Sequence, residues 1–189
     1  MTICPPPDDP RRLATEMFLR ATGPALIKRV ADILGSHGIL VMPLKGVLLQ
    51  KLVYGTAAFR PIVDVDVLVP EGRFFEAVGA LQSSGFPKVR WESGGWEVSL
   101  CDPKGPPLGV DLHRRLSRTV RSRLTVAGLF ARGTPDSSLF DAPVVLPSAN
   151  DLFAHLLLHA ALHWTSTGAL HRPEDFAAVS AAGLLSDPR

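Results

Sequence analysis

Apolar positions recur at helical spacing near the N-terminus and change to the alternating spacing of strands near residue 39. The pattern predicts helices over 11–21, 24–37, 46–54, 71–84, 148–164 and 174–182, with a further helix around 121–131. It predicts strands over 39–42, 62–69, 86–91, 96–101 and 108–113, and a small hairpin around 138–146. Helix and strand alternate first and a meander follows. This order indicates an α+β domain, a mixed β-sheet with flanking helices.

The chain divides into three segments. Three consecutive prolines at 5–7 predict an extended tail over 1–9, because proline offers no backbone donor and interrupts a helix. Residues 10–146 form the expected α+β domain. Residues 147–189 form a short C-terminal helical appendage, in which Ser148 is a good N-cap and Asp151 adds a favourable charge in the first turn.

Composition narrows the class of protein. Of 189 residues, 46% are hydrophobic and 20% charged, with a net charge of +2, which is typical of a globular domain with a sizeable core. The two cysteines, Cys4 and Cys101, are too far apart to form a disulfide scaffold or zinc motif, so a reducing cytoplasm is expected. The longest apolar stretch, 152–164, is shorter than a membrane span and contains histidines. The modest net charge does not favour nucleic acid as a partner, although it leaves that possibility open.

The strand predicted over 62–69 carries two acids. Because side chains alternate along a strand, Asp64 and Asp66 share one face and valines occupy the other. Two neighbouring carboxylates repel each other unless a cation lies between them, and Mg²⁺ or Mn²⁺ is the usual solution. The alternative is a solvated edge strand, but aspartate is depleted in strands.

A third acid lies in the strand predicted over 108–113, where Asp111 and His113 share a face. Three carboxylates from two strands can hold two metal ions, an arrangement that activates an attacking hydroxyl and neutralises a leaving phosphate. An ordinary surface position for Asp111 is an equally good interpretation.

Cationic residues flank these acids. Lys45 and Gly46 lie between a strand and a short helix, where backbone N–H groups and a lysine can face a phosphate; an ordinary turn is the alternative. Arg60 precedes the acid strand and either clamps a phosphate or pairs with Asp64.

Two further groups have competing interpretations. His155, His159 and His163 stack along one helix face at a spacing that can bind a transition metal, but histidines that line a cleft are the favoured interpretation. Five arginines follow the third acid: Arg114, Arg115, Arg118, Arg121 and Arg123. They either contact the acceptor, the triphosphate or a nucleic acid, or they form a solvated helix face. The solvated helix face is the favoured interpretation. The apolar stripe of the 151–164 helix suggests a homo-oligomer.

Together, LKGxxL at 44–49, Tyr54, RPxxDxDxLV at 60–69, VDLHRRL at 110–116 and LLLHAALH at 156–163 resemble the polymerase β-like nucleotidyltransferase superfamily, in particular its uncharacterised bacterial branch. The resemblance covers about residues 40–165. It implies that Asp64, Asp66 and Asp111 bind metal and carry catalysis, and that Lys45 and Gly46 form the nucleotide-phosphate loop, beside which Arg60 is a candidate phosphate clamp. The usual Gly-Ser pair of the wider superfamily is replaced here by Lys45-Gly46, and no serine follows.

The implied activity is metal-dependent transfer of a nucleoside monophosphate from an NTP to a hydroxyl or phosphate of a small molecule, peptide or protein, with release of pyrophosphate. Asp111 is the expected group to bind or deprotonate the attacking oxygen. The alternative is a catalytically silent binding or accessory protein of antitoxin-like type, which the missing serine favours. A metal-dependent hydrolase that uses the same acids is a third hypothesis.

Overall fold

The computed structural model describes residues 10–56, 58–62, 64–91, 95–101, 108–117, 124–167 and 172–183. The tail expected over 1–9 lies outside these residues. A mixed five-stranded sheet forms the centre, in the order β1-β2-β5-β4-β3. Its strands are β1 (Met42–Pro43), β2 (Asp64–Leu68), β3 (Lys88–Trp91), β4 (Glu97–Cys101) and β5 (Gly109–His113). β2 and β5 are parallel, whereas the other neighbours are antiparallel, so the predicted α+β class with a mixed sheet is confirmed.

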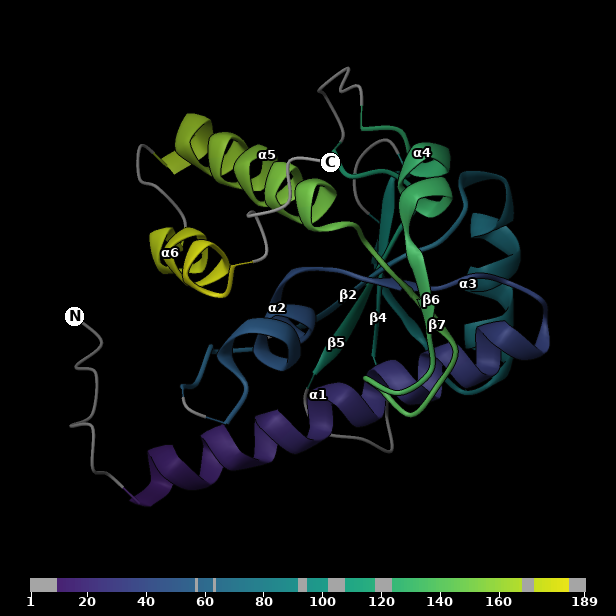
Figure 1. The fold of residues 1–189 in the computed structure, drawn as a ribbon. Helices are drawn as coiled ribbons and strands as arrows, with labels where there is room; N and C mark the ends of the chain where they lie inside the picture. The colour runs from purple at the N-terminus through teal and green to yellow at the C-terminus, as the bar shows by residue number, and fades with distance from the viewer. Residues whose placement is uncertain are drawn as a thin grey trace.

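Helices surround this sheet (Figure 1). They are α1 (Pro10–Ser36), α2 (Lys45–Leu49) with its π-helical continuation η1 (Gln50–Tyr54), the 3₁₀ turn η2 (Glu71–Arg73), α3 (Phe74–Ser83), α4 (Val126–Arg132), α5 (Ala149–Thr167) and α6 (Pro173–Ala181). A two-stranded ribbon of β6 (Thr134–Asp136) and β7 (Val144–Leu146) follows α4. It takes the place of the hairpin predicted around 138–146.

The sheet has one apolar face and one mixed face. Val65 and Val67 of β2 belong to the main core together with residues of α1 and α3. The opposite face carries a smaller apolar cluster near β1, which packs on α4. Polar side chains fill the rest of that face. The valines therefore fix the register of β2, because a shift by one residue would bury its aspartates against α1.

The first helix differs from the prediction. The sequence predicts two helices separated near Pro24, but α1 continues through this proline as one helix. A proline inside a helix removes one backbone hydrogen bond and costs roughly 3 kcal/mol. Beyond Pro24, α1 buries a continuous apolar stripe that includes Ile27, Val30 and Leu34, all with no exposed surface. Burial of that stripe outweighs the local cost.

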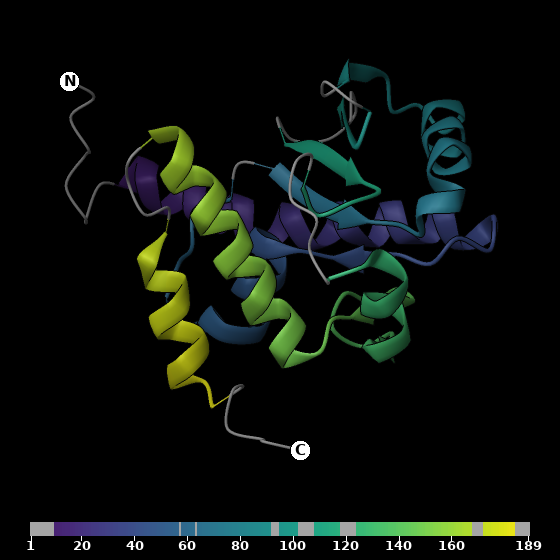
Figure 2. The same ribbon diagram turned by 90° about the horizontal axis from the view of Figure 1, so that it is seen from above.

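The C-terminal helices lie side by side at one end of the sheet, as Figures 1 and 2 show from two directions. Ser148 Oγ accepts a hydrogen bond from the Asp151 backbone N–H at 3.2 Å, so the predicted N-cap is confirmed. Leu152 and Leu156 of α5 and Val179 of α6 are buried in the main core of the sheet. Across the described residues, every helix is too short or too polar to cross a membrane.

Alanine substitutions at two glycines, one after α4 and one inside α3, provide a test of the packing. A Cβ at Gly133 would lie 2.5 Å from Val145 Cγ1 and 2.9 Å from the Leu146 carbonyl oxygen, whereas a Cβ at Gly79 inside α3 meets nothing within 4 Å. We expect Gly133→Ala to lower the free energy of unfolding by about 2 kcal/mol, because the overpacked strand must move. We expect Gly79→Ala to raise it by about 0.5–1 kcal/mol through helix propensity. Urea unfolding measures both, and equal effects of the two substitutions would contradict the packing.

Candidate active site

Three predicted acids lie on one face of the paired strands β2 and β5. In the parallel register, Asp66 is directly opposite Asp111 and Asp64 is opposite Gly109. Neighbouring residues in such a register point to the same face, and so do residues two apart on one strand. The fold therefore brings Asp64, Asp66 and Asp111 to the same side of the sheet, as the alternation of the sequence predicts.

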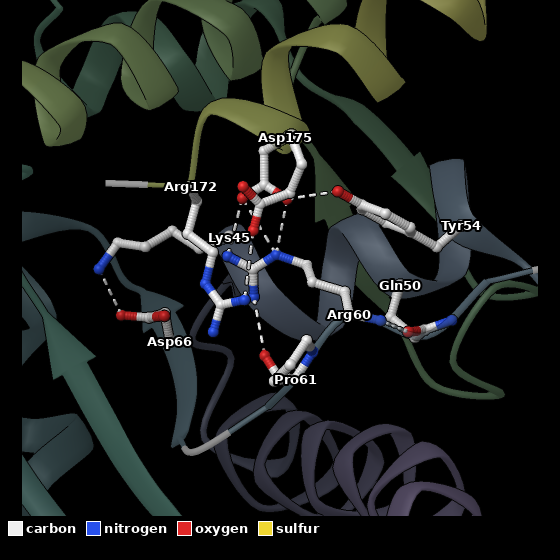
Figure 3. Close-up of polar contacts among 9 residues, drawn as sticks. Lys45, Gln50, Tyr54, Arg60, Pro61, Asp66, Arg172 and Asp175 are labelled. Atoms are coloured by element: carbon white, nitrogen blue, oxygen red, sulfur yellow. Dashed lines mark hydrogen bonds and ion pairs between the residues drawn. The ribbon is translucent and has the colours of Figure 1, made fainter. Parts of the chain in front are cut away.

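Asp66 is the buried centre of this face. It is 5% exposed, and its Oδ1 accepts a hydrogen bond from Lys45 Nζ at 2.7 Å. His113 Nε2 lies 3.0 Å from the same oxygen. One carboxylate oxygen is thus shared by an ammonium and an imidazole. Figure 3 shows the lysine reaching across to Asp66.

A series of polar contacts runs from Lys45 and Asp66 through His113 to Glu97. His113 Nδ1 lies 3.2 Å from Glu97 Oε2, and both residues are buried. The antiparallel register of β4 and β5 places Glu97 directly opposite His113. A protonated imidazole donates to both carboxylates, whereas a neutral ring donates to one. Glu97 is not among the residues that the sequence predicts for the site, and the only signal for it was its place on a strand next to Asp111 and His113.

The acids on this face differ in proton affinity. Burial, together with the charges of Asp66 and Asp111, raises the pKa of Asp64 to about 6. Burial also acts on Asp66, but the charge of Lys45 and the hydrogen bond with His113 outweigh it and hold the pKa of Asp66 well below its usual range. Burial raises the pKa of Glu97. The face therefore has an excess of negative charge that Lys45 does not fully compensate.

Lys45 and Gly46 have contacts that the sequence does not predict. Lys45 adopts a left-handed backbone conformation, with φ of 44°. Its ammonium group forms an ion pair with Asp66, whereas the sequence predicts that it faces a phosphate. A Cβ on Gly46 would lie 2.8 Å from Arg60 Nη1. A larger residue at Gly46 would therefore require the end of the Arg60 guanidinium to shift.

Arg60 pairs with Asp175 of α6, and not with Asp64 as one alternative proposed. Its Nε and Nη2 donate to the Asp175 carboxylate at 2.9–3.1 Å, and the Asp175 side chain is 3% exposed. Tyr54 Oη donates to Asp175 Oδ1 at 2.8 Å. Gln50 accepts from the Arg60 backbone N–H at 2.8 Å and so holds the start of the segment (Figure 3). A sequence separation of 115 residues hides this pair from local pattern analysis.

Within the described residues, no three His, Cys, Asp or Glu side chains are grouped closely enough to hold one ion, and this applies to the described histidines of α5 and to Asp64, Asp66 and Asp111 in their present positions. His155 is 3% exposed, and among the described residues its Nδ1 finds no hydrogen-bond partner. Burial and the nearby Lys45 charge lower the pKa of His155 to about 3. His159 lines a cleft, as the favoured interpretation predicts. The side chain of His163 lies outside the described part.

The basic cluster is only partly described. Arg114 lies over the Phe74 and Phe75 rings, and Arg115 forms an ion pair with Glu71. The predicted helix around 121–131 begins later, as α4. Arg118, Arg121 and Arg123 lie outside the described residues.

Because the negative charge on this face is not fully compensated, we expect the substitution Asp64→Asn to change the free energy of unfolding in a pH-dependent way. The measurement is made with a metal chelator present, so that no divalent ion is bound. A raised pKa means that ionised Asp64 destabilises the folded state, fully above pH 6 and less as the pH falls towards the unfolded value of 3.8. Allowing for partial solvent access, we expect Asp64→Asn to stabilise the protein by about 1–2 kcal/mol at pH 8 and by about half as much at pH 5. Urea unfolding at both pH values, with the surface variant Asp32→Asn as control, measures this. A destabilised Asp64→Asn protein at pH 8 would contradict it.

Comparisons with solved structures find nucleotidyltransferase folds. The crystal structure of ANT(2″)-Ia in complex with adenylyl-2″-tobramycin is similar with a TM-score of 0.59 and 12% identity, covering 84% of this chain and 88% of that chain. The lincomycin-bound lincosamide antibiotic adenylyltransferase LnuA gives a TM-score of 0.54 and 13% identity, covering 82% and 94%. An antigenic nucleotidyltransferase-like protein from Paracoccidioides brasiliensis gives 0.58 and 14%, covering 86% and 75%. At these identities the likeness establishes the fold.

A family model covers most of the chain. No curated protein matches the chain significantly. The model of the uncharacterised nucleotidyltransferase family matches residues 20–183, a span that runs from α1 to the end of α6 and includes every acid described above. The chain therefore belongs to this nucleotidyltransferase family.

Proposed function

We propose that the protein is a metal-dependent nucleotidyltransferase that moves a nucleoside monophosphate from an NTP to an acceptor hydroxyl or phosphate and releases pyrophosphate. The observation that carries this proposal is the register of β2 and β5, which puts Asp64, Asp66 and Asp111 on one face in a chain of this family. In this reaction the acceptor oxygen forms a bond to the α-phosphorus, the bond from that phosphorus to the bridging oxygen of pyrophosphate breaks, and the acceptor proton passes to a base.

The acids suit a divalent metal. Carboxylate oxygens are the ligands that Mg²⁺ and Mn²⁺ prefer. The pKa of Asp64 is raised first by burial and then by the charges of Asp66 and Asp111, and a cation would relieve both effects. Asp64, Asp66 and Asp111 would hold the ion once Lys45 has left Asp66 and the three carboxylates have moved closer together than they are in this structure. When bound, the metal would supply neutralisation of charge on the triphosphate.

The protein residues have separate roles in the proposed reaction. Asp111 lies next to Asp66 on the neighbouring strand and would accept the proton of the attacking hydroxyl. Lys45, once released, carries a positive charge towards the leaving pyrophosphate. His113, held by Glu97, fixes the orientation of the Asp66 carboxylate. Positioning and charge neutralisation would supply most of the rate enhancement.

The acceptor we favour is a small hydroxylated molecule. This choice rests on the printed descriptions of the structural neighbours, one with adenylyl-tobramycin and one with lincomycin bound. Peptide and protein acceptors remain part of the proposal. Tobramycin and lincomycin are accordingly the first acceptors to test.

A catalytically silent binding protein is the second candidate. The specific observation in its favour is the ion pair between the ammonium group of Lys45 and Asp66. A catalytic protein needs this carboxylate to be available for the metal. In that case the lysine is a permanent substitute for the metal. Binding of nucleotide would then be absent or independent of divalent ions.

Incubation with labelled nucleoside triphosphates tests the proposal. Mg²⁺ or Mn²⁺, the two antibiotics and a small-molecule cell extract are supplied, and pyrophosphate release and nucleotidylated products are measured. We expect metal-dependent product, and a loss on the order of 100-fold or more in Asp66→Asn and Asp111→Asn. Asp32→Asn on α1 is the matched control and keeps full activity. A folded wild-type protein that neither binds nor consumes any NTP would overturn the proposal in favour of the silent protein.

A further inference from the structure

A buried histidine of α5 lies near the side chain of Lys45. His155 is buried next to Leu156, one turn before His159 on the same side of the helix. Lys45, Leu156 and His159 line one small crevice, so the Lys45 side chain lies against this part of α5. Of the charges that act on His155, that of Lys45 has the largest effect. The buried histidine and the lysine of the acid face are therefore neighbours.

His155 Nδ1 is an unused hydrogen-bond acceptor. In the described part of the chain, four buried side-chain nitrogens have no hydrogen-bond partner: Arg20 Nε, Trp96 Nε1, Arg114 Nε and His155 Nδ1. The first three can only donate, whereas a neutral imidazole with its proton on Nε2 accepts at Nδ1. Burial and the positive charge of Lys45 lower the pKa of His155 to about 3, so its ring is neutral near pH 7. A buried acceptor without a partner requires an explanation.

Lys45 needs a new partner when it leaves Asp66. Its Nζ donates to Asp66 at 2.7 Å, and this carboxylate must be released before it can bind a divalent ion. The Lys45 side chain is only 17% exposed, so an ammonium group without a new partner would be a buried, unpaired charge. Two other acids act on the charge of Lys45, but Asp64 belongs to the proposed metal ligands and Glu97 is engaged by His113.

We propose that His155 positions the released Lys45, whose ammonium group moves from the Asp66 carboxylate to His155 Nδ1 when a divalent cation occupies the acids. The inference rests on the metal binding of the proposed function and adds a positioning residue on α5 to it. No proton is transferred, because one hydrogen bond of the ammonium group replaces another. Two of its three donors remain available for the leaving pyrophosphate. His155 thus stabilises the metal-bound arrangement without contacting metal or substrate.

A double-mutant cycle on Mn²⁺ affinity tests this role. Electron paramagnetic resonance of free Mn²⁺ measures the affinity, with no nucleotide present. His155→Leu removes the acceptor and keeps a buried apolar side chain. We expect it to weaken Mn²⁺ binding by about tenfold, because the released ammonium group loses its hydrogen bond. In the Lys45→Gln background no ammonium group has to move, so the same substitution should change the affinity by less than about twofold.

His155→Asn is the matched control. Its side-chain carbonyl oxygen can take the place of Nδ1 and accept the same hydrogen bond, so Mn²⁺ affinity should stay within about threefold of wild type. Thermal unfolding in a metal chelator separates binding from folding. His155→Leu replaces an unpartnered buried polar atom by an apolar group, so it should melt at or above the wild-type temperature. A lower melting temperature would mean that Nδ1 already has a partner in the metal-free protein, which contradicts the inference.

The cycle distinguishes the inference from the function on which it rests. Equal Mn²⁺ affinity of wild type and His155→Leu would overturn the inference. An equal loss in the wild-type and Lys45→Gln backgrounds would also overturn it, because His155 would then contact the metal itself. The expected cycle without nucleotide transfer would support the role of His155 and contradict the transferase activity, whereas transfer with unaltered Mn²⁺ affinity in His155→Leu would do the reverse. Folded variants that all fail to bind Mn²⁺ would overturn both.

Discussion

The ion pair between Lys45 and Asp66 stabilises the acid face, the side of β2 and β5 that carries Asp64, Asp66 and Asp111. The rest of the candidate site depends on this interaction. The valine side of β2 must pack on α1, and the alternation of the strand then forces Asp66 into a buried position on the other side. An unpaired buried carboxylate would be strongly destabilising, and the 2.7 Å contact with Lys45 Nζ relieves that cost. His113 and Glu97 extend the same compensation into β4 and β5.

A second buried pair connects the C-terminal helices to this face. Arg60 begins the segment that leads into β2, and its bidentate contact with Asp175 fixes α6 against it. A side chain at Gly46 would lie 2.8 Å from Arg60 Nη1, so the end of the Arg60 guanidinium would have to shift. The position of Arg172 at the start of α6 follows from this anchoring. The two ion pairs thus connect distant parts of the sequence, Lys45 with Asp66 and Arg60 with Asp175.

The sequence was sufficient where the pattern is local. Alternation predicted that Asp64 and Asp66 share a face, and the short strand around Asp111 predicted a third acid in the same sheet. It was insufficient where partners are distant, because nothing local links Arg60 to Asp175 or Glu97 to His113. Pro24 shows the same limit for the helices, since a local break signal was overridden by burial along α1. Lys45 was predicted to face a phosphate, but its contact with Asp66 depends on a backbone conformation that sequence patterns do not specify.

In the proposed site, Lys45 occupies the position that a divalent cation would take beside Asp66. Electron paramagnetic resonance of free Mn²⁺, titrated with wild-type protein and with Lys45→Gln in the absence of nucleotide, tests it most directly. If the ammonium competes with the metal for Asp66, Lys45→Gln binds Mn²⁺ more tightly than wild type, on the order of tenfold. Equal or weaker Mn²⁺ binding by a folded Lys45→Gln protein would contradict the account.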